Sequence, residues 1–253
     1  MSKRISRERL ARITSELTPR DREMVEFLAR VKLATGSQLR RAVWTDQSAA
    51  GKRSARRALA RLVCWRVLAR LERRQGGLGK GSDSWTYALD TAGQRLLGEA
   101  GARRPHLPRP AMWAHVLLGT EVAVTLAEAL RGTDRTVAIW QGEPECWRSY
   151  TGSHGQRLTL KPDAFVDVLS PEFHDVSYLE ADTGSQSRTV IRAKLAAYQR
   201  YAATGLDQRM QDGIFPLTVF VTVTPERQAV LVDLVNGHLE VPAGGQLIVP
   251  TRC

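Results

Sequence analysis

Three carboxylates in the second half of the sequence have the spacing of a divalent-cation site. Asp163 follows Pro162 in the stretch LKPDAFVDV, and Glu180 and Asp182 lie 17 and 19 positions later, in SYLEADTGS. Both stretches read as short strands, and alternation along a strand places Glu180 and Asp182 on one face. If the strands are neighbours, the three carboxylates converge and repel one another unless a cation joins them. Mg²⁺ or Mn²⁺ suits such oxygen ligands, and either ion could activate water to attack a phosphodiester.

Two further residues could complete this site. Lys194 lies on the apolar stripe of a helix expected over residues 187–205, so we expect its side chain to lean toward the sheet. Glu121 lies in the middle of an apolar helix expected over residues 111–131, and could orient a water molecule or bind the metal through one. The candidate catalytic residues are therefore Glu121, Asp163, Glu180, Asp182 and Lys194, and the candidate metal ligands are Asp163, Glu180 and Asp182.

The elements that must position these side chains follow one another as helix, three strands, helix, strand and helix. The expected strands cover residues 136–145, 157–168, 176–184 and 215–224, and Pro225 opens the last helix. This order predicts a central mixed sheet flanked by helices, so the fold class is α/β.

The first half of the chain has a different pattern. Helices are expected over residues 18–35, with Thr18 as cap and Pro19 at the first position, over 37–44 with Ser37 as cap, and over 48–66. Two alternating stretches then enclose a glycine-rich turn, which is typical of a hairpin. Three helices followed by a hairpin predict a winged helix-turn-helix domain.

The third of these helices has one apolar face and one arginine face. In a winged helix, that arginine face would enter the major groove of DNA and the hairpin tip would lie along the backbone. A solvated surface helix is the alternative interpretation of the same charges. The candidate DNA-binding residues are Arg53, Arg56, Arg57 and Arg61 of the helix, with Arg73, Arg74 and Lys80 of the turn.

Charge and composition divide the chain at the same place. The net charge is +11, and residues 1–110 hold 25 Lys and Arg against 10 Asp and Glu, whereas residues 111–253 hold 12 against 16. We expect a DNA-binding domain over 15–100, a linker rich in Pro and Arg over 101–110, and a second domain over 111–253. The expected partner is double-stranded DNA, and a homodimer is left open.

Other classes of protein are not expected. The glycine-rich segment GGLGKGS lacks the ending of a phosphate-binding loop, so no nucleotide cofactor is expected. We saw neither a signal peptide nor an apolar run of roughly 18–20 residues, and therefore expect a cytoplasmic protein that does not enter a membrane.

The pattern Glu121, Pro162-Asp163, Glu180-x-Asp182 and Lys194-x-x-x-Tyr198 resembles that of the PD-(D/E)xK nuclease superfamily. The whole chain, over roughly residues 15–235, resembles the replication-relaxation family of bacterial plasmids and mobile elements. The cues are LTPRD, LKPDAFV, LEADTGS and KLAAYQRY. This resemblance implies a role in the replication, mobilisation or topology of extrachromosomal DNA.

The chain departs from the superfamily pattern at one position. Asp182 stands where active members carry a lysine, and a lysine on the following helix, here Lys194, is a variation that the resemblance allows. Two functions therefore stay open. The first is a Mg²⁺- or Mn²⁺-dependent endonuclease or nickase, and the second is a winged-helix regulator whose nuclease-like domain serves dimerisation or partner binding.

Overall fold

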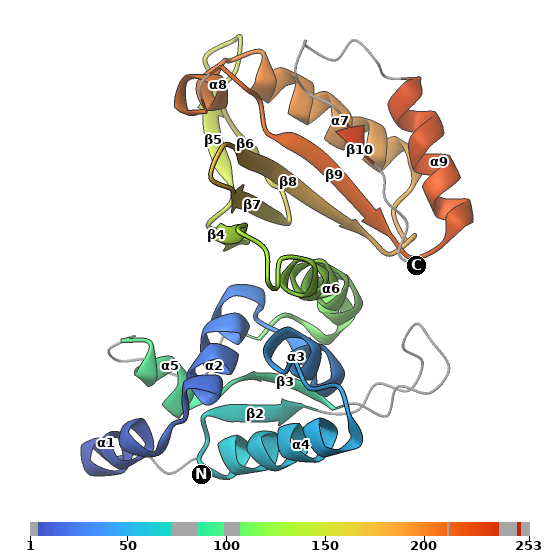
Figure 1. Cartoon of the computed structure of the whole chain (residues 1–253). Helices are drawn as coiled ribbons and strands as arrows, with labels where there is room; N and C mark the ends of the chain where they lie inside the picture. The colour runs from blue at the N-terminus through green and yellow to red at the C-terminus, as the bar shows by residue number, and fades with distance from the viewer. Residues whose placement is uncertain (1–4, 72–84, 99–106, 212, 238–246, 249–253) are drawn as a thin grey trace. The chain divides into compact units, whose positions relative to one another are not determined.

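The computed structural model describes residues 5–71, 85–98, 107–211, 213–237 and 247–248. The chain forms two compact units, unit 1 over residues 1–129 and unit 2 over residues 130–253 (Figure 1). The division lies after the apolar helix that we had assigned to the second domain, and not in the expected linker at 101–110. Most of that linker lies outside the described residues.

Four helices open unit 1, and capping residues set where they begin. They are α1 (Arg7–Glu16), α2 (Pro19–Val31), α3 (Gly36–Val43) and α4 (Ala49–Cys64). The predicted start of α2 is confirmed, since Thr18 and Asp21 form a reciprocal capping box. The cap of α3 is Thr35 rather than Ser37, because Gln38 three residues later completes the same motif.

A small antiparallel sheet accompanies these helices. Its strands are β1 (Ala34–Thr35), β2 (Leu68–Leu71) and β3 (Thr86–Leu89), in the order β1-β3-β2. The elements follow along the chain as α2, β1, α3, α4, β2 and β3, so the three predicted helices and the two strands after them are present, with β1 in addition. Residues 72–84, the predicted hairpin tip, lie outside the described residues, and α5 (Thr91–Leu96) follows β3.

The apolar helix α6 (Trp113–Ala129), preceded by the short η1 (Pro110–Met112), packs on this unit. Trp113 joins Leu33 and Ala88 in one apolar cluster, so α6 covers a face of the small sheet. All four residues of β3 are buried, so both faces of this strand are covered. The predicted alternation implied a strand with only one buried face.

One segment, Pro110–Ala129, is long and apolar enough to cross a membrane by length and composition alone. From the sequence we expected no apolar run of this length. The segment carries the buried Glu121 and packs against α3 and the sheet, which is the behaviour of a core helix in a globular unit.

Unit 2 is built on a mixed sheet, which confirms the predicted α/β class. Its strands β4 (Thr136–Gly142), β7 (Ala164–Leu169), β8 (His174–Asp182), β9 (Leu217–Thr222) and β10 (Leu247–Ile248) lie in the order β10-β9-β8-β7-β4. Strands β8, β9 and β10 are parallel, and β4, β7 and β8 are antiparallel. Helices α7 (Arg188–Ala202) and α9 (Pro225–Asn236) pack together with Phe220 of β9, and α8 (Leu206–Met210) follows α7 (Figure 1).

The predicted strand over 157–168 is two strands. Strand β6 (Arg157–Leu160) ends before Pro162 and pairs with β5 (Arg148–Thr151) in a separate hairpin, while β7 joins the main sheet. Pro162 cannot donate to a strand ladder, and its carbonyl accepts a hydrogen bond from Cys146 Sγ at 3.0 Å. The break places Asp163 directly before the first residue of β7.

Candidate functional site

The first carboxylate, Asp163, is held beside β8 by the backbone. Its N–H donates to the Leu179 carbonyl at 3.0 Å, and its Oδ2 accepts from the Ala181 N–H at 2.7 Å. These two contacts bracket Glu180 on the neighbouring strand. The predicted convergence of Asp163 and Glu180 is therefore present in the structure.

The second carboxylate, Glu180, is only 2% exposed and faces α7. Its Oε2 accepts a short hydrogen bond from Lys194 Nζ, and its Oε1 accepts from the Tyr198 hydroxyl at 2.7 Å. Lys194 and Tyr198 are one helical turn apart, so α7 presents both to the same side chain. The predicted lean of Lys194 toward the sheet is confirmed.

Burial and charge perturb both members of this pair. Burial, together with the charge of Asp163, raises the pKa of Glu180 to about 7, although Lys194 and Tyr198 oppose the shift. Burial alone would lower the pKa of Lys194, but the charges of Glu180 and Asp163 outweigh it and leave this pKa raised. Lys194 is therefore a fixed cation, while Glu180 changes its charge near neutral pH.

This perturbation predicts a pH dependence of stability. Between about pH 4.5 and 7, Glu180 holds more proton in the folded than in the unfolded chain, so the stability it contributes falls as pH rises through this window. Because a single proton is involved, the free energy of unfolding changes by at most about 1.4 kcal/mol per pH unit. We therefore expect the free energy of unfolding, measured with urea in EDTA, to fall less over this pH window for Glu180→Gln than for wild type. Glu172→Gln, at an exposed position, should follow wild type. Parallel curves for wild type and Glu180→Gln would contradict the assignment.

The third carboxylate, Asp182, is neutralised by a different partner. Its Oδ2 accepts from Arg227 Nη2 at 2.7 Å and from Nε at 3.1 Å, and its Oδ1 accepts from the Gly184 N–H at 2.6 Å. Asp182 and Thr222 are register partners at the ends of the parallel strands β8 and β9. Since α9 begins soon after β9, its first turn brings Arg227 to Asp182. We therefore remove Asp182 from the candidate metal ligands.

Glu121 belongs to unit 1 and has partners there. Its carboxylate accepts from Gln38 Nε2 at 2.9 Å and forms an ion pair with Arg41. Arg41 also pairs with Glu128, about two turns later on α6, and these carboxylates raise the pKa of the guanidinium. Glu121 thus joins α6 to α3, and we do not retain it as a catalytic candidate.

Asp163 and Glu180 remain as candidate ligands of a metal ion. Within the described ranges, no group of three or more His, Cys, Asp or Glu side chains is placed to hold one. Mg²⁺, however, is commonly bound by one or two carboxylates with waters and substrate phosphates. Asp163 and Glu180 fit that smaller role, because an ionised carboxylate can accept several contacts through its two oxygens. Their mutual repulsion would be relieved by a cation between them.

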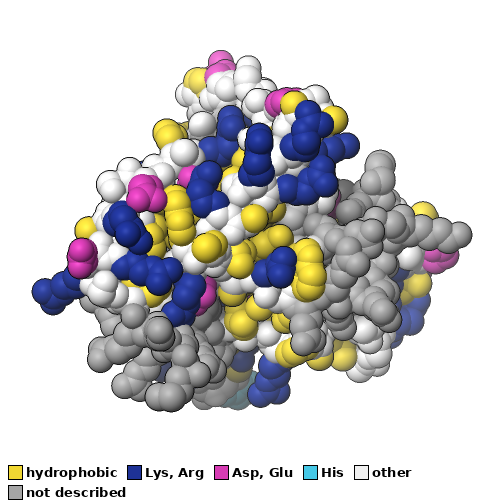
Figure 2. Space-filling model, turned by 90° about the horizontal axis from the view of Figure 1, so that it is seen from below, with side chains coloured by type: hydrophobic (Ala, Val, Ile, Leu, Met, Phe, Trp, Pro, Cys, Tyr) yellow, Lys and Arg dark blue, Asp and Glu magenta, His cyan; other side chains and the backbone are white. Residues whose placement is uncertain are grey.

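The predicted arginine face of α4 is present in unit 1. Ala55, Leu59 and Leu62 are buried, whereas Arg53, Arg56 and Arg57 are exposed. Figure 2 looks onto the side where α4 lies in Figure 1, and shows Lys and Arg side chains spread over this surface. Arg73, Arg74 and Lys80 lie outside the described residues.

Arg61 has a structural role that the charge pattern did not indicate. Its Nη2 donates to both oxygens of the buried Asp21, at 2.8 and 2.6 Å, and its guanidinium lies over the Trp65 ring. Asp21 also caps α2 through Thr18, so Arg61 joins α4 to the start of α2. It is less available to DNA than Arg53, Arg56 or Arg57.

Comparison with known proteins gives one match, to a protein family. A family model described as replication-relaxation matches residues 25–218. No curated protein and no solved structure shows a significant match to the chain.

Proposed function

The chain belongs to the replication-relaxation family, which indicates a role in the replication or relaxation of plasmid or mobile-element DNA, and from this premise we propose a division of labour between its units. Unit 1 binds duplex DNA as a winged helix-turn-helix. Unit 2 cleaves a DNA phosphodiester with Asp163, Glu180 and Lys194. This carboxylate–lysine centre is proposed without Asp182 and without Glu121.

One observation carries the cleavage proposal, namely the contact of Lys194 Nζ with the buried Glu180 beside Asp163. Lys194 thus supplies from α7 the positive charge that a lysine at the position of Asp182 would otherwise provide. A buried carboxylate whose pKa is strongly shifted by desolvation and by a charged neighbour is a recurrent feature of catalytic sites. An ordinary surface ion pair would not place Glu180 at 2% exposure with a pKa near 7.

Each residue has a distinct role in this proposal. Asp163 and ionised Glu180 would hold a Mg²⁺ or Mn²⁺, which when bound supplies Lewis-acid activation of water. Lys194 stays protonated and stabilises the negative charge that develops on the phosphate oxygens. Tyr198 orients Glu180 through its hydroxyl and thereby keeps the carboxylate turned toward α7.

The exposed arginines of α4 support the binding half of the proposal. Arg53 and Arg57 are one turn apart on the solvent face, and neither has a carboxylate partner among the described side chains. Unpaired guanidinium groups of this kind neutralise DNA phosphates and release counterions. Arginine is also able to donate two hydrogen bonds to a guanine edge in the major groove.

A non-catalytic regulator is the second candidate, and it has its own observation. Arg227 neutralises Asp182, and the described residues contain no site with three acidic ligands. Under this alternative, Glu180, Lys194 and Tyr198 form a structural network, and unit 2 serves dimerisation or binds a partner protein. Cleavage chemistry separates the two candidates.

The test is conversion of supercoiled plasmid to open or linear forms with Mg²⁺ and then Mn²⁺. Wild type should cleave, and Asp163→Asn should lose at least about 100-fold in rate while keeping its affinity for DNA. Asp175→Asn, an exposed carboxylate change in the same unit, should cleave as wild type does. If wild type binds DNA but gives no product with either metal, the regulator becomes the better account.

A further inference from the structure

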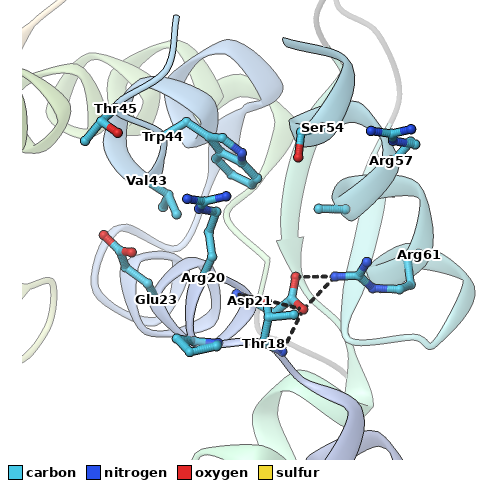
Figure 3. Close-up of a pocket in the computed structure, with 12 residues that line it drawn as sticks. Thr18, Arg20, Asp21, Glu23, Val43, Trp44, Thr45, Ser54, Arg57 and Arg61 are labelled. Carbon is cyan, nitrogen blue, oxygen red and sulfur yellow. Dashed lines mark hydrogen bonds and ion pairs between the residues drawn. The ribbon is translucent and has the colours of Figure 1, made fainter. Parts of the chain in front are cut away.

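A pocket of about 700 Å³ lies in unit 1, whereas the carboxylate–lysine centre belongs to unit 2. Figure 3 shows that the first turn of α2, the end of α3 and one face of α4 surround it. Its volume is in the range of pockets that bind small organic molecules, and well beyond what a single phosphate fills. The cleavage centre proposed above uses none of its residues.

The pocket contains a buried donor without a partner. Trp44 is 2% exposed and lines the pocket, and its indole Nε1 has no hydrogen-bond acceptor among the described residues. In Figure 3 the ring stands between Arg20 and Ser54, with its nitrogen edge toward Ser54. Buried donors are nearly always satisfied in folded proteins, so an unsatisfied one indicates that an acceptor belongs there.

The charge available in the pocket is positive. Arg20 lies over the Trp44 ring, 5.2 Å from its centroid, and neither Arg20 nor Arg57 has an ion-pair partner within the described ranges. Asp21 is already engaged by Thr18 and Arg61, as the dashed lines of Figure 3 show. Glu23 is the second carboxylate in a lining that holds three arginines.

These groups define the ligand by its chemistry. The unpaired donors are two guanidinium groups, the indole N–H and the nearby hydroxyls of Thr45 and Ser54, so the ligand must be an anion with several acceptor atoms. Because Arg20 covers the Trp44 ring, recognition rests on hydrogen bonds rather than on stacking. A nucleotide has the required size, negative charge and acceptors on its phosphate, sugar and base.

We propose that this pocket binds a nucleotide that is not stacked in a duplex, with its phosphate at Arg20 and Arg57 and an acceptor atom at Trp44 Nε1. The ligand is either an unpaired nucleotide of a DNA strand or a free nucleotide. The DNA source rests on the proposed function, because α4 is the helix placed on DNA. Other proteins bind extruded or single-stranded nucleotides through hydrogen bonds and basic grooves of this kind.

The experiment uses the full chain and three probes: a free deoxynucleoside monophosphate, a labelled single-stranded oligonucleotide and the matching duplex. Arg20→Gln and Arg57→Gln are compared with Arg53→Gln, which removes the same charge from α4 outside the pocket. Trp44→Phe removes the N–H donor and keeps an aromatic ring. Binding is measured by anisotropy for the oligonucleotides and by calorimetry for the monophosphate, and urea unfolding verifies that each variant is folded.

For the single strand, Arg20→Gln and Arg57→Gln should each lose about tenfold more affinity than Arg53→Gln, and Trp44→Phe should also weaken binding. For the duplex, Arg53→Gln and Arg57→Gln should lose similar amounts, because each removes one phosphate contact of α4, and Arg20→Gln should lose less. If the monophosphate binds with the same dependence on these residues, a free nucleotide is the ligand; if only the strand does, the source is DNA.

The proposal is overturned if Arg20→Gln, Arg57→Gln and Trp44→Phe bind single strand and monophosphate as Arg53→Gln does. If wild type still binds the duplex in that case, the proposed function stands. Wild type that binds none of the three probes would instead count against DNA binding altogether.

Discussion

Replacing Lys194 with Gln should reduce plasmid cleavage by about 100-fold or more and leave DNA affinity unchanged. The glutamine keeps a hydrogen-bond donor for Glu180 but removes the cation that we propose to act on the scissile phosphate. Because Lys194 lowers the pKa of Glu180, its loss should also move the acidic limb of the pH–rate profile to higher pH.

Two further variants separate a chemical role of Lys194 from a structural one. Arg192→Gln removes the same charge from an exposed position on the same helix, and should cleave at the wild-type rate. Lys194→Arg keeps the charge, and should retain part of the activity and of the pH profile. Equal activity of Lys194→Gln and Arg192→Gln would contradict the role given to Lys194.

The second large effect is on stability, at Arg227. Arg227→Ala should lower the free energy of unfolding by about 3–5 kcal/mol, because it leaves the buried Asp182 without its cation. Asp182→Asn combined with Arg227→Ala should recover most of this loss, since no buried charge remains. The midpoint of urea unfolding at constant slope measures both effects.

Arg188→Ala is the matched control, because Arg188 forms an ion pair with Asp233 that is exposed on both sides. Such pairs contribute at most about 1 kcal/mol, so this variant should unfold close to wild type. If Arg227→Ala also unfolds like wild type, Asp182 is not held as described. Asp182→Asn alone should still cleave plasmid, because its carboxylate faces Arg227 rather than the proposed centre.

Local signals in the sequence predicted the parts of the fold that short segments determine by themselves. The start of α2 follows from Thr18, Pro19 and Asp21, and the buried face of α4 follows from apolar spacing. The contact of Lys194 with Glu180 was also predictable, since a lysine on the apolar stripe of α7 has few directions other than the sheet.

Features that depend on distant partners were not predictable in this way. Arg227 lies 45 positions from Asp182, and only the parallel register of β8 and β9 brings the two together. Glu121 has the type and spacing of a catalytic residue, yet Gln38 and Arg41 on α3 bind it because α6 packs in unit 1. The position of a carboxylate in a sequence pattern therefore indicates a candidate catalytic residue. The side chain that pairs with it in the folded protein decides whether it takes that role.

The most direct test of the central claim is a double-mutant cycle on plasmid cleavage with Asp163→Asn, Lys194→Gln and the double variant. If Asp163, Glu180 and Lys194 act as one centre, the double variant should cleave no more slowly than the slower single variant, because either change alone disables the centre. Losses that multiply in the double variant would mean that Asp163 and Lys194 act independently, and would contradict the account.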